Sequence, residues 1–246
     1  MRWQTTIAAM TAAALLAACG EIPVGGPGRA ADGPADCRET AFARPVALPA
    51  ELARLTVEDR KTVFVNTVLP AIRAANGEVM CERATLQAAL RSGNDAAARA
   101  VLAGFAERYG SDDPAVLLWR VAPVPTGLAL AQAAMESGWG TSRFAREGNA
   151  LFGMQNRGGA GLKARDSDAT VFAYDDLHAS ARHYARTLNT HPAYREFRLR
   201  RAASRGEAAD SCALAQTLTR YSARGEAYGR ELCALIRAND FDEADL

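Results

Sequence analysis

Residues 124–154 read VPTGLALAQAAMESGWGTSRFAREGNALFGM. The stretch 128–135 is apolar on nearly every face, which predicts a buried helix, and Thr126 is expected to be its N-cap. A helix of this composition belongs inside a domain. It ends on a single carboxylate, Glu136, which is followed directly by the sequence SGWG.

Glu136 is the first candidate for chemistry. A carboxyl group at the end of a buried helix loses hydration, and this loss raises its pKa. A carboxylic acid that is still protonated near neutral pH can protonate a departing sugar oxygen, as glycosidases require. The neighbouring glycines allow backbone to approach a ligand, and Trp139 offers a flat apolar face to a sugar ring. The alternative, a solvated Glu at a helix C-terminus, is unfavourable with the helix dipole. On physical grounds both interpretations stand.

The motifs themselves resemble a known family. ALAQAAMESGWGTS followed by NALFG is similar to the signature of the glucosaminidase domain of glycoside hydrolase family 73, the mannosyl-glycoprotein endo-β-N-acetylglucosaminidase-like domain, and to its Bax-type subgroup. Segments 171–184, 188–195 and 220–228 match the same pattern in the same order, so the resemblance covers roughly 55–240. It implies a mainly α, lysozyme-like α+β fold with a small β-hairpin lobe beside a substrate groove. The implied activity is hydrolysis of the β-1,4 bond between N-acetylglucosamine and N-acetylmuramic acid in peptidoglycan.

The same resemblance suggests further site residues. In the family a tyrosine of the last motif faces the catalytic acid, so Tyr228 and then Tyr221 are expected beside Glu136. The other residues that we expect to line the substrate site are Trp139, Asn149, Phe152, Tyr174 and Tyr184. Asn149 can hydrogen-bond either a loop backbone or a substrate amide, and these two roles are weighed equally.

The group that attacks the anomeric carbon is not fixed by the sequence. The family's second acid lies in the hairpin lobe, where this chain offers Asp166 and Asp168 at no motif position, and Asp168 is kept as the catalytic candidate. If neither reaches the site, the substrate's N-acetyl oxygen can attack instead. His191 precedes a proline and is expected to cap a turn rather than act as a base. A lytic transglycosylase and a non-catalytic wall-binding lipoprotein are the alternative functions.

Composition and the N-terminus define the organisation of the chain. The 246 residues, 49% hydrophobic with formal net charge +1, suit one domain and give no reason to expect nucleic acid as a partner. Residues 1–18 resemble a lipoprotein signal peptide ending at Cys19, the expected lipid-bearing residue. A Gly- and Pro-rich tether would span 19–51 and the catalytic domain 52–246. The expected protein is an exported monomer, anchored by lipid at the periplasmic face, with Gly20 favouring the outer membrane.

The remaining four cysteines predict two disulfides. The segments 212–220 and 226–238 predict a helical hairpin whose turn lies between Cys212 and Cys233, so antiparallel helices bring these two level. Elimination then pairs Cys37 with Cys81. The sequence holds no recognised set of metal ligands, so neither a metal nor another cofactor is expected.

The N-terminal part of the domain predicts further helices. Thr56 and Asp59 resemble a capping box at the start of a helix. Pro70 is expected to kink or divide that helix.

Overall fold

The structure, a computed structural model, describes residues 37, 47–93, 95–156, 158, 161–165, 169–204 and 210–242. Helices dominate the described part of the chain, with one two-stranded antiparallel sheet. This confirms the expected mainly α fold with a small β-hairpin. The helices are α1 (Val57–Arg91), α2 (Ala96–Tyr109), α3 (Pro114–Arg120), α4 (Thr126–Ser137), α5 (Arg143–Gly148), α6 (Leu177–Thr190), α7 (Arg195–Ala203), α8 (Ser211–Ala215) and α9 (Glu226–Ala238), with short 3-10 turns at Leu52–Arg54 and Pro192–Tyr194.

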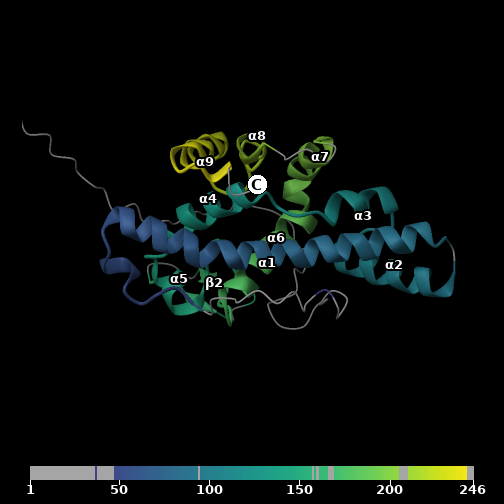
Figure 1. The fold of residues 1–246 in the computed structure, drawn as a ribbon, viewed down its shortest axis with the longest axis horizontal. Coiled ribbons are helices and arrows are strands. Elements are labelled where there is room, and N and C mark those ends of the chain that lie inside the picture. The colour runs from purple at the N-terminus through teal and green to yellow at the C-terminus, as the bar shows by residue number, and fades with distance from the viewer. Residues whose placement is uncertain are drawn as a thin grey trace, which may run out of the picture.

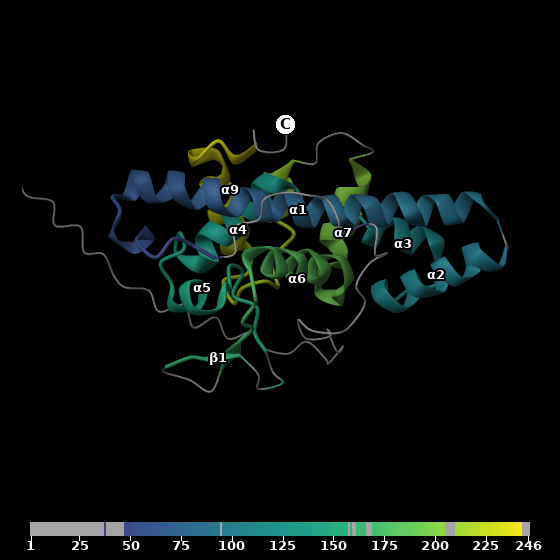
Figure 2. The same ribbon diagram turned by 60° about the horizontal axis from the view of Figure 1, so that its bottom comes forward.

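Helix α1, with 35 residues, runs along the long axis of the molecule (Figures 1 and 2). It begins as predicted, because the Thr56 side chain accepts a hydrogen bond from the Asp59 backbone N–H at 3.2 Å. It then runs unbroken through Pro70, so the prediction that Pro70 would divide the helix is wrong. A proline removes one helical N–H, but the face that carries Phe64 and Val68 is fully buried, and α1 packs against both α4 and α6. This packing offsets the lost hydrogen bond.

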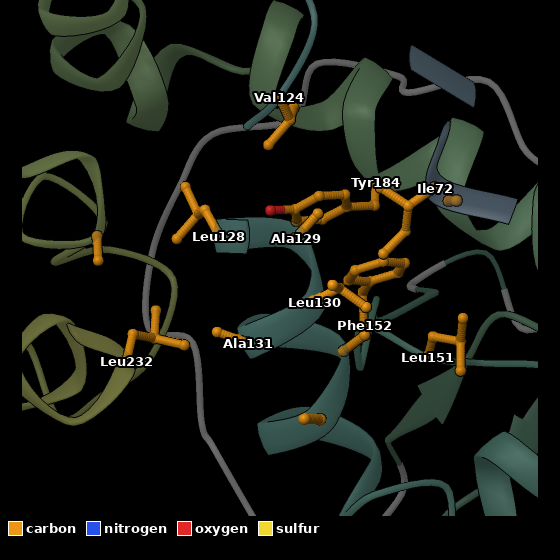
Figure 3. Close-up of a cluster of buried hydrophobic side chains, with 14 of the residues drawn as sticks. Ile72, Val124, Leu128, Ala129, Leu130, Ala131, Leu151, Phe152, Tyr184 and Leu232 are labelled. Atoms are coloured by element: carbon orange, nitrogen blue, oxygen red, sulfur yellow. The ribbon is translucent and has the colours of Figure 1, made fainter. Parts of the chain in front are cut away.

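Helix α4 lies in the centre of the main core, as its composition predicts. Leu128, Leu130 and the alanines around them are fully buried, and Figure 3 shows them between Tyr184 and Phe152 on one side and Leu232 on the other. The expected N-cap at Thr126 is wrong. Pro125 holds that position without a side-chain hydrogen bond, and Thr126 is already the first helical residue. The Pro125 carbonyl accepts the first helical hydrogen bond, from the Ala129 N–H at 3.0 Å, so the helix begins one residue earlier than expected.

The hairpin lobe is small. β1 (Leu162–Lys163) pairs with β2 (Thr170–Val171) in antiparallel register, with Leu162 opposite Val171. The chain between Glu136 and this lobe passes through α5. Within the described residues no helix is both long enough and apolar enough to cross a membrane.

The C-terminal helices form the predicted hairpin, but its first helix is shorter than expected. α8 ends at Ala215 instead of near Arg220, and hydrogen-bonded turns fill the segment before α9. Both predicted disulfides are confirmed: Cys212–Cys233 joins α8 to α9, and Cys37–Cys81 ties the N-terminal segment to α1. Two disulfides are typical of an exported protein. The predicted signal peptide and Cys19 lie outside the described residues.

Candidate active site

Glu136 lies in the last turn of α4 and is half-buried. The helix stops directly after it because Gly138, Trp139 and Gly140 all take positive φ values of 58°, 55° and 77°. The Ser137 hydroxyl, which is buried, accepts a hydrogen bond from the Gly140 N–H at 2.8 Å and so holds the turn. The predicted ESGWG stretch is thus a fixed helix end that carries one carboxyl group.

Three buried side chains form a chain of hydrogen bonds that ends on this carboxyl group. The Tyr228 hydroxyl from α9 donates to Glu136 Oε1 at 2.8 Å. Gln132, one turn before Glu136 on α4, donates through Nε2 to the Tyr228 oxygen at 2.9 Å. The Tyr184 hydroxyl from α6 donates to Gln132 Oε1 at 2.5 Å. We call Tyr184, Gln132, Tyr228 and Glu136 the tyrosine relay.

Stacked aromatic rings hold the relay in place. Tyr221 stacks on Tyr228 with ring centroids 5.5 Å apart, and its hydroxyl donates to the Phe152 carbonyl at 2.8 Å. Phe152 in turn stacks on Tyr184 at 4.0 Å, and the two parallel rings are visible beside α4 in Figure 3. Phe152 and Tyr184, which were predicted for the substrate site, and Tyr221, which was predicted beside Glu136, are therefore buried side chains that support Tyr228.

Burial sets the electrostatics of the site. Loss of hydration raises the pKa of the Glu136 carboxyl above its usual range, although the Tyr228 hydrogen bond and the positive charge of Arg224 each lower it. Burial, and then the charge of Glu136, raises the pKa of the Tyr228 phenol well above its usual value. Tyr228 therefore stays protonated, and its hydroxyl donates a hydrogen bond to Glu136.

The second oxygen of Glu136 faces backbone. Gly153 has φ +62°, and a Cβ built on it would lie 3.1 Å from Glu136 Oε2. This is closer than side chains normally approach, so the glycine leaves room at Oε2 that any other residue would fill. The two carboxyl oxygens thus have different surroundings. The Tyr228 hydroxyl lies at Oε1, and Gly153, which has no side chain, lies at Oε2.

Trp139 lies in another group of side chains. Its indole ring meets Phe64 edge-on at 5.6 Å, and the Lys61 ammonium lies 5.1 Å from its centroid. Phe241 is a third neighbour, at 6.1 Å. The structure therefore does not group Trp139 with the tyrosine relay, and its role in sugar binding stays a prediction.

Asn149, which follows α5, and Tyr174, which follows β2, belong to segments that are joined by hydrogen bonds. Asn149 is the C-cap of α5, and its Nδ2 donates to the carbonyl groups of Tyr174 and Asp175 at 3.0 and 3.3 Å. Of its two expected roles, the structure shows the backbone contact. Burial lowers the pKa of His183 to about 4, so this ring is neutral, and its Nδ1 shares a hydrogen bond with the Tyr174 hydroxyl at 2.7 Å.

The remaining candidates are a histidine, two aspartates and any group of metal ligands. His191 caps a 3-10 turn, where its Nδ1 accepts from the Ala193 N–H at 3.2 Å, as expected of a His-Pro junction. Asp166 and Asp168 lie outside the described residues. Within the described ranges, no group of three or more His, Cys, Asp or Glu side chains could hold a metal ion.

Sequence analysis missed Gln132, Gly153 and Arg224. Gln132 had a signal, because it is the one polar residue within the apolar run 128–135 and lies four positions before Glu136, on the same face. Arg224 had a weaker one. It belongs to the 220–228 segment, and its guanidinium lies 5.2 Å from the Tyr228 ring centroid.

Comparison with known proteins decides the family. The model of the Glucosaminidase family, described as mannosyl-glycoprotein endo-beta-N-acetylglucosaminidase, matches residues 113–241, just over half of the chain. The chain belongs to the glucosaminidase family. Protein bax of Escherichia coli (strain K12) is 35% identical over 191 residues, which cover 73% of this chain and 70% of that protein.

A solved structure is also similar to this glucosaminidase. The catalytic domain of the autolysin Auto from Listeria monocytogenes aligns with a TM-score of 0.45 and 16% identity, over 78% of this chain and 90% of that one. Membership of the family makes the protein a glycoside hydrolase. The predicted family and enzyme class are confirmed.

Proposed function

We propose that the protein hydrolyses peptidoglycan glycan strands at the β-1,4 bond between N-acetylglucosamine and N-acetylmuramic acid, leaving N-acetylglucosamine at the new reducing end. The observation that carries this proposal is the Glu136 carboxyl group. It is half-buried, its pKa is raised by burial, and Tyr228 holds it at 2.8 Å. A glucosaminidase needs one carboxylic acid that is protonated at working pH, and Glu136 fits that need.

In the first step Glu136 is the general acid. It gives its proton to the glycosidic oxygen while the bond from that oxygen to the anomeric carbon breaks and positive charge develops on the sugar ring. Glu136 becomes a carboxylate as the proton leaves. The hydrogen bond from Tyr228 becomes charge-assisted at that moment, so it is stronger in the transition state than in the ground state.

For the second step we propose substrate assistance. The N-acetyl oxygen of the substrate attacks the anomeric carbon, and water then opens the resulting ring with its proton returned to Glu136, so the configuration is retained. This choice rests on the hairpin acids Asp166 and Asp168, which match no motif position. Proton NMR of the first product distinguishes the routes, since a β anomer supports substrate assistance and an α anomer requires a second carboxylate that activates water.

Product analysis tests the function. Purified full-length protein, Glu136→Gln and the control Glu147→Gln are incubated with peptidoglycan, and the released fragments are identified by mass. Glu147 is an exposed carboxylate on α5 that pairs with Arg143. We expect reducing-end N-acetylglucosamine from the wild type and the control, and a loss of at least about 100-fold in Glu136→Gln. Anhydro-muramyl products would reassign the protein as a lytic transglycosylase, and binding without release would make it a wall-binding lipoprotein.

We also propose that Cys19 carries lipid and that the chain between Cys19 and Cys37, where the disulfide to Cys81 attaches it to α1, tethers the domain to a membrane, with the outer membrane as its location. The sequence LAAC at 16–19 supports this proposal. Fractionation of cells tests it: the wild type is expected with the membrane, and Cys19→Ser is expected to lose its lipid and leave the membrane fraction. Equal membrane retention of the two would contradict a lipid anchor at Cys19.

A further inference from the structure

We propose that Gln132 is a positioning residue that fixes the direction of the Tyr228 hydroxyl and thereby assigns the acidic proton of Glu136 to Oε2. This inference rests on the proposed role of Glu136 as general acid. It concerns the proton that the acid delivers and the oxygen from which that proton leaves.

Burial makes Gln132 unusual. Its side chain has no exposed surface, and its neighbours on α4 from Leu128 to Ala134 are leucine and alanine. Burying an amide is costly unless both of its ends are hydrogen-bonded. Here both ends are, because Oε1 accepts from Tyr184 and Nε2 donates to Tyr228. A leucine or methionine would fill the same space without this requirement, so packing alone does not account for the amide.

The direction of each hydrogen bond follows from the one before it. The Tyr184 hydroxyl donates, so the carbonyl end of the Gln132 amide faces Tyr184 and its NH₂ end faces Tyr228. The Tyr228 oxygen then accepts from Gln132, and its single proton is left for Glu136 Oε1 at 2.8 Å. Hydrogen bonds in such a chain polarise one another, so donation from Gln132 strengthens donation from Tyr228.

The consequence falls on Glu136. Oε1 accepts the hydrogen bond from Tyr228, so it is not the oxygen that carries the acidic hydrogen, and this hydrogen belongs on Oε2. Oε2 is the oxygen beside Gly153, where the absence of a side chain leaves room. If the Gln132 amide were absent, Glu136 could also place its proton on Oε1 and donate it to Tyr228. In that arrangement the acidic proton of Glu136 points at Tyr228 and not at the substrate, and the hydrogen bond stabilises the protonated form of Glu136.

The test replaces Gln132 with the similarly shaped but apolar methionine. Gln132→Met is expected to lower kcat on soluble peptidoglycan fragments roughly tenfold. It should also raise the pKa of Glu136, measured directly by ¹³C NMR of the labelled carboxyl group, and move the alkaline limb of the kcat/KM profile to higher pH. Tyr184→Phe, which removes one oxygen and frees the amide to turn, should act in the same direction more weakly. Thr187→Val, which removes another buried oxygen from α6, is the matched control and should leave the pKa of Glu136 in place.

A double-mutant cycle shows whether Gln132 acts through Tyr228. In a Tyr228→Phe background, Gln132→Met should cause no further rise in the pKa of Glu136. An unchanged pKa in Gln132→Met, or a second shift that adds to that of Tyr228→Phe, would overturn the inference. If Gln132→Met does not fold, Tyr184→Phe carries the same test. Full activity of Glu136→Gln would refute the proposed function instead, and the NMR titration would still report separately on the relay.

Discussion

At the scale of single residues, Glu136 is a carboxyl group between opposing influences. Burial raises its pKa, while Tyr228 and Arg224 favour the ionised form. In the proposed mechanism Glu136 is a general acid and must be protonated to act, so we expect activity to be lost as the pH rises through this pKa. The balance of these influences is therefore expected to set the alkaline limit of the enzyme.

Arg224 offers a way to shift that limit. Its positive charge lowers the pKa of Glu136, so Arg224→Gln should raise this pKa and move the alkaline limb of kcat/KM to higher pH. The shift should be smaller than that of Tyr228→Phe, because the Arg224 side chain is 42% exposed and also pairs with Glu231. Arg230→Gln, a charge change on an exposed side chain of α9, is the control. A limb that moves to lower pH in Arg224→Gln would contradict this account.

Replacing Gly153 and Gly140 with alanine is predicted to have different effects, on activity in the first case and on stability in the second. Gly153→Ala would place a Cβ 3.1 Å from Glu136 Oε2 at φ +62°, so kcat should fall roughly 10- to 100-fold. Gly140→Ala would place a Cβ 2.5 Å from Leu52 Cδ2, inside the core, so it should lower the free energy of unfolding by about 1–3 kcal/mol. Kinetics and denaturant unfolding of both variants check the contrast. Equal losses of activity per folded molecule would show that Gly153 has no particular relation to the acid.

At the scale of elements, the site depends on three helices that meet: α4 carries Gln132 and Glu136, α6 carries Tyr184, and α9 carries Tyr228. Sequence analysis placed α4 and the C-terminal hairpin because apolar runs and cysteine spacing are local signals. It could not show that α6 and α9 converge on Gln132, since that meeting depends on tertiary packing. It was wrong at Pro70 for the same reason, because burial against α4 and α6 outweighs a local helix breaker.

The disulfide between α8 and α9 is expected to hold Tyr228 in place. It closes a loop of 21 residues, so replacing both cysteines with alanine should cost about 3 kcal/mol of unfolding free energy. Activity of Cys212→Ala/Cys233→Ala should be lost at a lower temperature than in the wild type. Cys37→Ala/Cys81→Ala is the comparison, because this disulfide is attached to α1 and not to α9, which carries Tyr228. This variant should be less stable than the wild type, with the kcat of the folded enzyme unchanged. An unchanged Tm in the first variant would contradict the expected stabilisation.

At the scale of the whole molecule, the fold class, the family and both disulfides could be anticipated from the sequence. The aromatic support of Tyr228 could not. Phe152 and Tyr184 were expected to line a substrate site, and Tyr221 was expected beside the acid. All three are buried, with Phe152 stacked on Tyr184 and Tyr221 stacked on Tyr228. Motif membership marks such residues as important without separating a contact with sugar from a contact with the residue that holds the acid.

A raised pKa also affects the stability of the folded protein. Below the ordinary glutamate pKa of 4.5, Glu136 is protonated in both the folded and unfolded states, and its burial carries no ionisation penalty. As the pH rises through the folded-state pKa, the unfolded chain ionises more readily, and stability is lost. Glu136→Gln should therefore be more stable than the wild type near neutral pH, with a difference that disappears below about pH 4. Thermal unfolding across pH checks this, and a difference that grows toward low pH would contradict it.

The most direct measurement is the titration of Glu136 itself. In ¹³C-labelled wild-type protein, with the signal assigned by its absence in Glu136→Gln, the carboxyl pKa should lie above 4.5 and coincide with the alkaline limb of kcat/KM. Agreement of the two values would identify Glu136 as the proton donor. A pKa at or below the ordinary range, or an alkaline limb at a pH unrelated to this titration, would contradict the central claim.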